Sequence, residues 1–355
     1  MSFSSVPIID ISPLLGSNQD DRDRAAEKDR VIKAIGHACR TVGFFYVVGH
    51  GVDEALQNQL ADAARAFFAL PRATKRRFEM AKGGKAWRGY FEVGEELTSG
   101  VVDEKEGLYF GEELPASDPR PLHGPNFWPT GDAVGADLAA ALRASVTGYM
   151  DAMTALGHTL LAAIAASLGL RPDHFGAQFR APTQLFRVFH YPPHDPAHPD
   201  SFAVGEHSDY GYVTILKQDA SGGLQVKNAV GHWVDAPPVP NSFVINLGDA
   251  LEHNTGSLLR ATPHRVRQRT GATAGRYSFP FFFDPSFDAR LESVVDRLPP
   301  ALRREAARRR AAAPARWDGK DVNLFDGTYG DYLLAKVSRV FPELAKATPE
   351  VQSRL

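Results

Sequence analysis

Hydrophobic and polar residues recur with two different periods along this chain, and the change of period divides it into regions. From about residue 22 to 42, apolar residues return every three to four positions, which predicts an amphipathic helix. The run "FFYVVGHG" that follows is typical of a buried strand ended by glycine. Asp53 can cap a second helix, and a third helical pattern runs from about residue 134 to 170. The first half of the chain is therefore expected to be mainly helical.

Between Thr183 and Phe283 the pattern changes to short runs rich in β-branched and aromatic residues, separated by Gly, Pro and Asn. Many short strands without intervening helices favour a sandwich or a barrel over a doubly wound α/β sheet. A last helix is expected in "YGDYLLAKVSRVF", so helices flank the β region on both sides. The expected strands are "QLFRVFHYP", "YVTILKQD", "GLQVKN", "HWVDAP", "SFVINLGD", "HRVRQR" and "RYSFPFFF".

Residues 83–133 show no sustained period and are rich in glycine, proline and aromatic residues. An irregular segment of this length in a compact protein is usually functional, and its aromatic content argues against disorder. We therefore expect a helical N-terminal part with a substrate-lid loop, residues 1–133. A β-rich catalytic part with a packing helix and a C-terminal helix, residues 134–355, would complete one compact domain.

Composition narrows the function classes. The 355 residues are 43% hydrophobic and 23% charged, as in an ordinary globular protein, and the formal net charge of −2 gives no general electrostatic case for nucleic acid or anionic membrane. No apolar run approaches the roughly 20 residues of a membrane helix, and the N-terminus does not resemble a signal peptide. We expect a cytoplasmic protein, monomeric or weakly homo-oligomeric. The single Cys39 excludes an internal disulfide and a thiolate zinc cluster, so His, Asp or Glu would hold any metal.

A candidate metal site lies in "VGEHSDYGYVTIL", residues 204–216. His207 and Asp209 are two positions apart, and side chains two apart on a strand point the same way. Among the other histidines of the β region, only His264 has the position of a strand residue that faces inward, together with Val266. We expect it to complete the site from the opposite sheet of the sandwich. Two histidines and one carboxylate leave open metal positions, as in non-haem Fe(II) oxygenases, although a zinc hydrolase could use a similar set.

Twelve residues past His264, "RYSFPFF" places Arg276 and Ser278 on one face of an otherwise apolar strand. A guanidinium inside a β core is costly unless it meets an anion, and its fork matches a carboxylate. Tyr191, on a preceding strand, can add a phenolic contact. A metal with open positions beside a carboxylate clamp fits 2-oxoglutarate, whose keto-acid end can occupy two metal positions.

These motifs resemble the isopenicillin N synthase-like Fe(II)/2-oxoglutarate-dependent dioxygenases over nearly the whole chain. "VPIIDISPLL" and "GFFYVVGHGV" resemble the family's N-terminal region, and "HSDYG", "GGLQV", "VINLGDAL", "RATPHRV" and "RYSFPFFFDP" its catalytic core in order and spacing. The resemblance implies a mostly β fold with flanking helices and a double-stranded β-helix (jelly-roll) core. It implies that iron is held by His207, Asp209 and His264, and 2-oxoglutarate by Arg276, Ser278 and Tyr191.

The resemblance also implies an oxidoreductase that uses O2 and 2-oxoglutarate to oxidise, most often to hydroxylate, a C–H bond of a small molecule, with release of succinate and CO2. Isopenicillin N synthase and the plant oxidase that makes ethylene from a cyclic amino acid keep the Arg-x-Ser pair without using 2-oxoglutarate. A 2-oxoglutarate-independent oxidase therefore stays open as an alternative. A metal-binding sandwich without catalysis would not need the Arg276–Ser278 pair. A zinc hydrolase would need a general base for which no motif position is present.

Residues 87–129 resemble the matching region of the bacterial ethylene-forming enzyme, so we expect a bacterial member of the family, with ethylene formation as a further alternative. In that enzyme the positions that correspond to four residues of this chain lie around the substrate or cosubstrate, and the residue types are kept: Glu96, Thr98, Arg187 and Arg339. The chain departs from it at three positions, which moves it toward ordinary hydroxylases: Ser278, Phe341 and Tyr191.

An acidic side chain on the lid opposite an inward arginine favours a small, amino-acid-like or nitrogen-containing substrate. The candidate substrate residues are Arg187, Glu96, Thr98, Tyr210, Arg339 and Phe341. Several of these and of their neighbours also have simpler interpretations. Glu96 is equally well explained as a solvated loop charge, and Arg339 as a surface arginine on a helix. We expect Asn246 and Asp249 to order a turn, and Asp103, Glu104 and Glu106 to form a solvated face.

Overall fold

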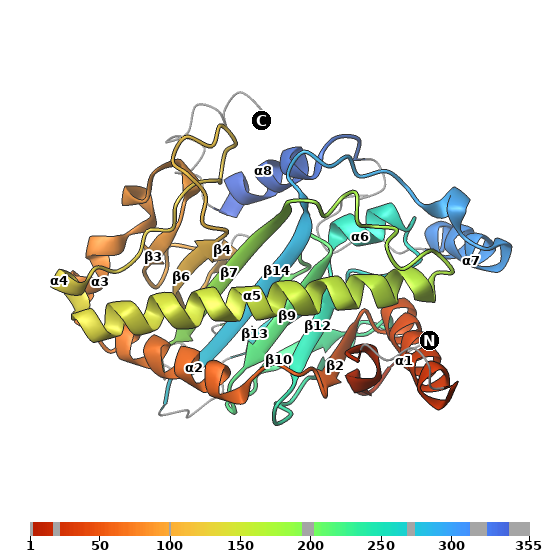
Figure 1. Cartoon of the computed structure of the whole chain (residues 1–355), viewed down its shortest axis with the longest axis horizontal. Coiled ribbons are helices and arrows are strands. Elements are labelled where there is room, and N and C mark those ends of the chain that lie inside the picture. The colour runs from red at the N-terminus through yellow and green to blue at the C-terminus, as the bar shows by residue number, and fades with distance from the viewer. Residues whose placement is uncertain are drawn as a thin grey trace.

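The computed structural model describes residues 3–16, 22–98, 101–193, 202–267, 274–312 and 325–340. Two β-sheets form the centre of the molecule, and helices lie around them (Figure 1). The architecture is the expected mostly β fold with flanking helices around a jelly-roll core.

The strands of the larger sheet pair, among the described residues, in the order β1-β2-β12-β9-β14-β7-β6-β3. Their bounds are β1 (Ile8–Asp10), β2 (Phe44–Val48), β12 (Phe243–Leu247), β9 (Val213–Gln218), β14 (Arg276–Ser286), β7 (Pro182–Tyr191), β6 (Glu106–Gly111) and β3 (Gly89–Phe91). The smaller sheet has the order β11-β10-β13-β8. It comprises β11 (Trp233–Asp235), β10 (Leu224–Lys227), β13 (His264–Arg267) and β8 (Phe202–His207), and a separate ribbon pairs β4 (Leu97–Thr98) with β5 (Val101–Val102). All seven runs expected as strands between Thr183 and Phe283 form strands.

The long helical patterns also form helices where they were expected. Asp53 caps α2, since its carboxylate accepts a hydrogen bond from the backbone N–H of Ala55 at 2.8 Å. The α-helices are α1 (Arg22–Thr41), α2 (Glu54–Phe68), α3 (Arg72–Lys75), α4 (Gly131–Val134), α5 (Ala136–Ser167), α6 (Asp249–Asn254), α7 (Pro300–Ala311) and α8 (Tyr329–Val340). Short 3-10 helices are Ser12–Leu14, Arg76–Phe78, Met80–Lys82, Gly84–Ala86 and Val295–Arg297.

Helix α5 covers one face of the larger sheet and runs across its strands (Figure 1), with α1 and α2 packed beside it. Tyr149 of α5 is fully buried against Phe186 of β7, with ring centroids 5.1 Å apart. Gly157 lets the helix approach β14 closely, because a Cβ at this position would lie 2.5 Å from the ring of Phe283. This face of the sheet is therefore sealed by helices, and a site must lie on the face toward the smaller sheet.

Residues 83–133 contain more regular structure than their pattern predicts. β6 pairs with β7, and β3 pairs with β6, so the segment extends the larger sheet. Every residue of β6 is buried, so apolar and polar residues do not alternate along it and the sequence gives no strand signal.

The expected solvated acidic face in this segment is wrong for two of its three residues. Asp103 is 1% exposed and Glu106 is 6% exposed, whereas Glu104 is partly exposed. Each buried carboxylate has a buried cation beside it. Asp103 pairs with Lys105, and Glu106 pairs with Lys75 at 2.6 Å. Pairing lowers the cost of burying these charges, and sequence alone did not show the partners.

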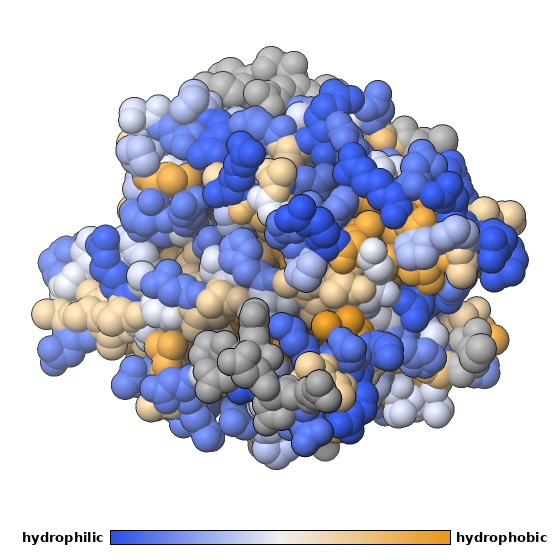
Figure 2. Space-filling model, turned by 45° about the vertical axis from the view of Figure 1, so that its right-hand side comes forward, coloured by the Kyte–Doolittle hydropathy of each residue, from blue (hydrophilic) through white to orange (hydrophobic). Residues whose placement is uncertain are grey.

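The face in Figure 2 is mainly hydrophilic, with hydrophobic residues in small separate groups. Within the described residues, the large hydrophobic side chains that are exposed are Ile8, Leu15, Val93 and Val230. None of the described helices is both long enough and apolar enough to cross a membrane.

Candidate active site

The three candidate metal ligands come from the smaller sheet and its connection to β9. His207 is the last residue of β8, His264 is the first residue of β13, and the two are register partners in the antiparallel pair. The expectation that His264 reaches the site from the opposite sheet is therefore wrong, because β13 and β8 are neighbours in one sheet. Asp209 lies in the connection between β8 and β9, so the turn sets its direction and strand alternation does not.

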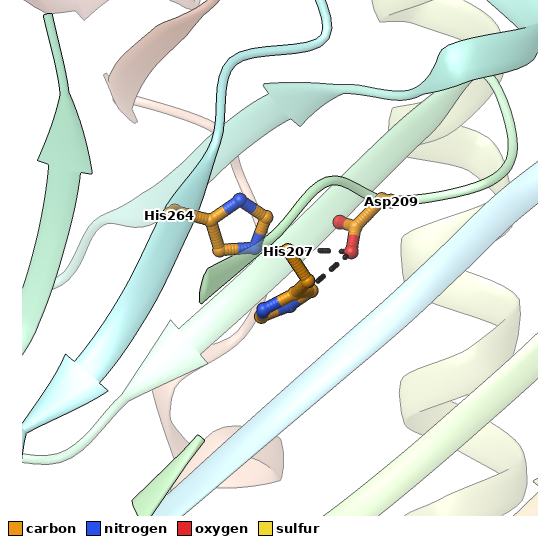
Figure 3. Close-up of side chains that lie close together, drawn as sticks. All are labelled: His207, Asp209 and His264. Atoms are coloured by element: carbon orange, nitrogen blue, oxygen red, sulfur yellow. Dashed lines mark ion pairs between the residues drawn. The ribbon is translucent and has the colours of Figure 1, made fainter. Parts of the chain in front are cut away.

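Figure 3 shows the three side chains pointing toward one common centre. Asp209 Oδ1 lies 3.8 Å from His207 Nε2 and 3.8 Å from His264 Nε2. One ligand atom of each residue lies within 4.8 Å of the others, which is close enough for all three to bind one ion. Two imidazoles and one carboxylate are the donor set of non-haem iron oxygenases with open coordination positions.

Hydrogen bonds from the second ring nitrogen of each histidine fix the orientation of these two candidate ligands. His207 Nδ1 lies 2.8 Å from the carbonyl oxygen of Gly205, and His264 Nδ1 lies 3.2 Å from that of Thr262. Because a carbonyl oxygen only accepts, each Nδ1 carries the proton and each Nε2 presents a lone pair to the centre. Such partners are a regular part of metal sites.

The second oxygen of Asp209 is also held. Oδ2 accepts hydrogen bonds from Thr214 Oγ1 at 2.5 Å and from Asn246 Nδ2 at 2.6 Å. Oδ1 is thereby directed toward the histidines. Asn246 was expected only to order a turn, and its contact with Asp209 depends on the pairing of β12 with β9, which its own sequence motif does not reveal.

The electrostatics favour the protonation states that a metal ion requires. Burial lowers the pKa of His207, and burial together with His207 lowers the pKa of His264 to about 4. Burial alone would raise the pKa of Asp209, but His264, His207 and its two hydrogen bonds outweigh that effect and hold the pKa below its usual value. Neutral imidazoles and a charged carboxylate are ready to bind a cation without losing protons first.

Asn246→Leu is expected to weaken Fe(II) binding about 10- to 100-fold, because partners behind metal ligands typically contribute that much to affinity. Anaerobic titration with Fe(II) would measure the change. Asn228→Leu is a matched control, since its amide oxygen orders the turn between β10 and β11 through the N–H groups of Val230 and His232. An equal loss of affinity in both variants would contradict a specific role for Asn246.

A cavity of about 360 Å³ opens between the two sheets and contains the candidate metal ligands. Inward residues of β7, β9 and β14 line one side, and β8, β10 and β13 line the other. Glu96 and Lys105 close a third side, and residues of α8 close a fourth.

Arg276, Ser278 and Tyr191 meet in this cavity, as expected. Arg276 and Tyr191 are register partners of β14 and β7, with the guanidinium carbon 4.7 Å from the tyrosine ring centre. Arg276 Nε donates to the carbonyl oxygen of Gly222 at 2.8 Å, whereas the buried Nη1 has no hydrogen-bond partner among the described residues. Ser278 Oγ and Tyr191 OH lie 3.4 Å apart. An unsatisfied buried guanidinium nitrogen is costly, so this corner suits a ligand carboxylate.

Arg187 points into the same cavity from β7, and Glu96 faces it. Glu96 is 2% exposed, so its interpretation as a solvated loop charge is wrong. Its Oε1 accepts hydrogen bonds from the Arg187 guanidinium at 3.2 Å and from the Tyr109 hydroxyl at 2.8 Å. Its Oε2 forms an ion pair with Lys105 Nζ at 2.7 Å. Lys105 and Tyr109 were missed at the sequence level, because "DEKEGLYF" gives no sign of which charges are buried.

The side chains around Glu96 form a charge-balanced network of two cations and two carboxylates: Lys105, Arg187, Glu96 and Asp103. Burial would raise the pKa of Glu96, but Lys105 and Arg187 hold it at about 2, so this carboxylate is charged. Burial would lower the pKa of Lys105, but Glu96 and Asp103 raise it above its usual value.

Of the remaining candidate substrate residues, Tyr210 lines the cavity. The backbone of Thr98 lies in β4 and that of Arg339 in α8, but their side chains are outside the described residues, as is the whole of Phe341.

Two family models match the chain. A model described as non-haem dioxygenase in morphine synthesis N-terminal covers residues 6–131, and the 2OG-Fe(II) oxygenase superfamily model covers residues 182–285. A probable iron/ascorbate oxidoreductase of Dictyostelium discoideum is 39% identical over 97% of both chains. A 1-aminocyclopropane-1-carboxylate oxidase of Dictyostelium mucoroides is 33% identical over 97% of both. A homoarginine-6-hydroxylase of Glycine max is 34% identical over 82% of this chain and 89% of its own.

Solved structures agree with these matches. A full-length Neurospora crassa protein in complex with alpha-KG has a TM-score of 0.75 and 26% identity, over 94% of this chain and 96% of its own. A putative 2OG-Fe(II) oxygenase family protein from Caulobacter crescentus has a TM-score of 0.74 and 27% identity, over 95% of this chain and 100% of its own. The chain therefore belongs to the 2OG-Fe(II) oxygenase superfamily and is a non-haem iron, 2-oxoglutarate-dependent oxidoreductase.

Proposed function

We propose that the enzyme hydroxylates a small amino-acid-like or nitrogen-containing molecule. Iron and 2-oxoglutarate supply the oxidising power when bound, with succinate and CO2 as co-products. In this proposal the ligands of the iron are His207, Asp209 and His264, and the residues that hold the distal carboxylate of 2-oxoglutarate are Arg276, Ser278 and Tyr191.

The substrate class is inferred from the hydrogen bonds that Arg187 makes, and from the one it lacks, in the cavity. Glu96 is surrounded by donors, whereas Arg187 meets it through one contact of 3.2 Å and its buried Nε has no hydrogen-bond partner among the described residues. The guanidinium can therefore accept a second anion, and its fork suits a carboxylate.

A zwitterion fits this corner better than a large hydrophobe. Its carboxylate would bind the Arg187 guanidinium, which Glu96 already holds in place, so that a charge of the ligand meets the cation with an unused donor. The rings of Phe189 and Phe282 line the same side of the cavity and can pack on the carbon skeleton. A ligand without charges would leave the Arg187 nitrogen unsatisfied.

The names of several relatives support a substrate of this kind. The 1-aminocyclopropane-1-carboxylate oxidases and the homoarginine-6-hydroxylases are named for amino acids. Another structure of the Neurospora crassa protein contains alpha-KG and thymine, a nitrogen heterocycle. Nitrogen heterocycles are therefore the second class to test. Tyr210, Thr98, Arg339 and Phe341 stay candidate substrate contacts.

Amino acids or nitrogen heterocycles are expected to stimulate succinate release from 2-oxoglutarate, whereas flavonoids are not. With any hit, Arg187→Leu and Glu96→Gln are expected to raise the substrate KM tenfold or more, because truncating one partner of a buried charge pair costs about 2 to 5 kcal/mol. Arg265→Leu is the matched control, since this arginine stacks on Trp233 at 4.0 Å and does not line the cavity.

The KM for 2-oxoglutarate should stay nearly constant in Arg187→Leu and Glu96→Gln. This result would distinguish their role in substrate binding from the role of Arg276 in binding 2-oxoglutarate. The proposal is wrong if only flavonoid-like hydrophobes stimulate turnover and neither substitution changes the KM.

A further inference from the structure

Helix α8 forms one wall of the cavity and lies across the upper ends of β7 and β14 in the view of Figure 1. Leu333, Lys336 and Val337 of this helix line the cavity directly. The walls opposite are strands, whose backbones are hydrogen-bonded into sheets and cannot separate without breaking a ladder. The helix has no such ladder, so its own contacts decide whether the cavity is closed.

The first turn of α8 is fixed to the body of the protein by its backbone. The N–H groups of Tyr329 and Gly330 donate to the carbonyl oxygens of Ala289 and Phe287, each at 2.8 Å. A Cβ on Gly330 would lie 2.5 Å from the Phe287 ring, so the glycine permits this close approach. The Tyr329 hydroxyl adds a bond to Asp284 at 2.6 Å. This turn is the anchored end of the helix.

Farther along, the polar contacts of α8 converge on Asp249, whose side chain is fully buried. Asp249 Oδ2 accepts the hydroxyl of Tyr332 at 2.9 Å and lies 3.2 Å from Lys336 Nζ. Tyr332 and Lys336 are four residues apart and therefore lie on one face of the helix. Together they hold the part of α8 that covers the cavity.

Asp249 also holds the segment that carries the candidate metal ligand Asp209. Its Oδ1 accepts the hydroxyl of Ser208 at 2.8 Å, and its backbone N–H donates to the carbonyl oxygen of Asp209 at 2.8 Å. One carboxylate thus bridges the helix over the cavity and the residues next to the metal. Asp284 makes a similar bridge from Tyr329 to the backbone N–H of Tyr212, on the other side of Asp209.

We propose that Asp249 is a positioning residue that couples the docking of α8 to the conformation of the metal-binding segment 207–212. When α8 lifts from the cavity, Asp249 Oδ2 loses the donors Tyr332 and Lys336, while Oδ1 still accepts the Ser208 hydroxyl, so the carboxylate must turn or become hydrated on one side. Its contact with Ser208 then changes, and the orientation of Asp209 changes with it. The metal site has its full affinity only while the cavity is closed. This inference holds for any substrate.

The test compares Tyr332→Phe/Lys336→Met with the parent chain, both loaded with Co(II) as the probe metal. Amide hydrogen exchange of residues 329–340 is expected to become at least tenfold faster, and the Kd for Co(II) at least threefold higher. The visible Co(II) bands are expected to shift, although neither substituted residue belongs to the proposed ligand set. Ser338→Ala is the control in the same helix, since its hydroxyl bonds to the carbonyl oxygen of Leu334, and it should change none of the three readouts.

Two results would overturn the proposal. If α8 exchanges faster while the Co(II) affinity and bands stay the same, the helix and the metal segment are not coupled. If exchange does not change, Tyr332 and Lys336 do not hold the helix.

A second pair of variants covers the case in which the double variant unfolds α8 completely. Asp249→Asn keeps an acceptor for Ser208 and removes the charge that faces Lys336, so it should weaken Co(II) binding moderately. Adding Lys336→Met to Asp249→Asn should then have little further effect, because the two groups act through one contact. Fully additive losses would contradict the coupling.

Discussion

Asp209→Ala and His264→Ala are each expected to abolish succinate formation while the fold survives. Each removes one of three donor groups that converge within 4.8 Å, and the remaining two cannot hold iron with useful affinity. Both side chains face the cavity, so their loss does not remove a wall of the hydrophobic core. Succinate release and anaerobic Fe(II) titration measure the effect, and circular dichroism checks the fold.

His232→Ala provides the control, because this exposed histidine lies in the turn before β11, outside the cavity. It should keep normal iron binding and turnover. Retained iron and normal turnover in Asp209→Ala or His264→Ala would remove these residues from the metal site.

Arg276→Leu is expected to raise the KM for 2-oxoglutarate roughly 30-fold or more and to leave Fe(II) affinity nearly unchanged. A charge-assisted contact in a closed site is worth about 2 to 5 kcal/mol when one partner is removed, and each 1.4 kcal/mol corresponds to about tenfold. The Nη1 atom of Arg276 has no hydrogen-bond partner among the described residues. Replacing the arginine by leucine therefore breaks no contact between this nitrogen and a carboxylate of the protein. Steady-state kinetics with 2-oxoglutarate as the varied substrate measures the change.

Arg290→Leu, at an exposed arginine paired with Asp326, should behave like the parent chain. An unchanged dependence on 2-oxoglutarate in Arg276→Leu would mean that the clamp holds the carboxylate of the prime substrate. Ethylene formation, the other alternative reaction, would be detected by gas chromatography of the same mixtures.

Much of the β core could be predicted because its strands have one face in the cavity or at the surface. In β14, Arg276 and Ser278 face the cavity between apolar neighbours, so this polar pair could be recognised in the sequence as a candidate ligand-binding pair. The candidate metal ligands could be singled out for the same reason, since His207, Asp209 and His264 are chemically distinct from the apolar residues around them. The helix cap at Asp53 was also predicted correctly, because it depends only on residues next to it in the sequence.

The remaining errors concern contacts between residues far apart in sequence. β6 is buried on both faces and shows no alternation, and Lys105 resembles an ordinary surface lysine until Glu96 and Asp103 are placed beside it. The sheet that supplies His264 also could not be known, because strand order does not follow from the strand pattern. The bacterial origin and the oligomeric state stay predictions.

The register partnership of His207 and His264 has a consequence for the order of events during folding. A slip of one residue between β8 and β13 would turn every side chain of one strand to the opposite face and bring Arg265 to the place of His264. Contacts between residues so far apart in sequence form late, after the entropy of closing a long loop has been overcome. The complete three-ligand set therefore does not exist until this pairing is correct, and apolar neighbours such as Val204 and Val266 must set the register without help from the metal.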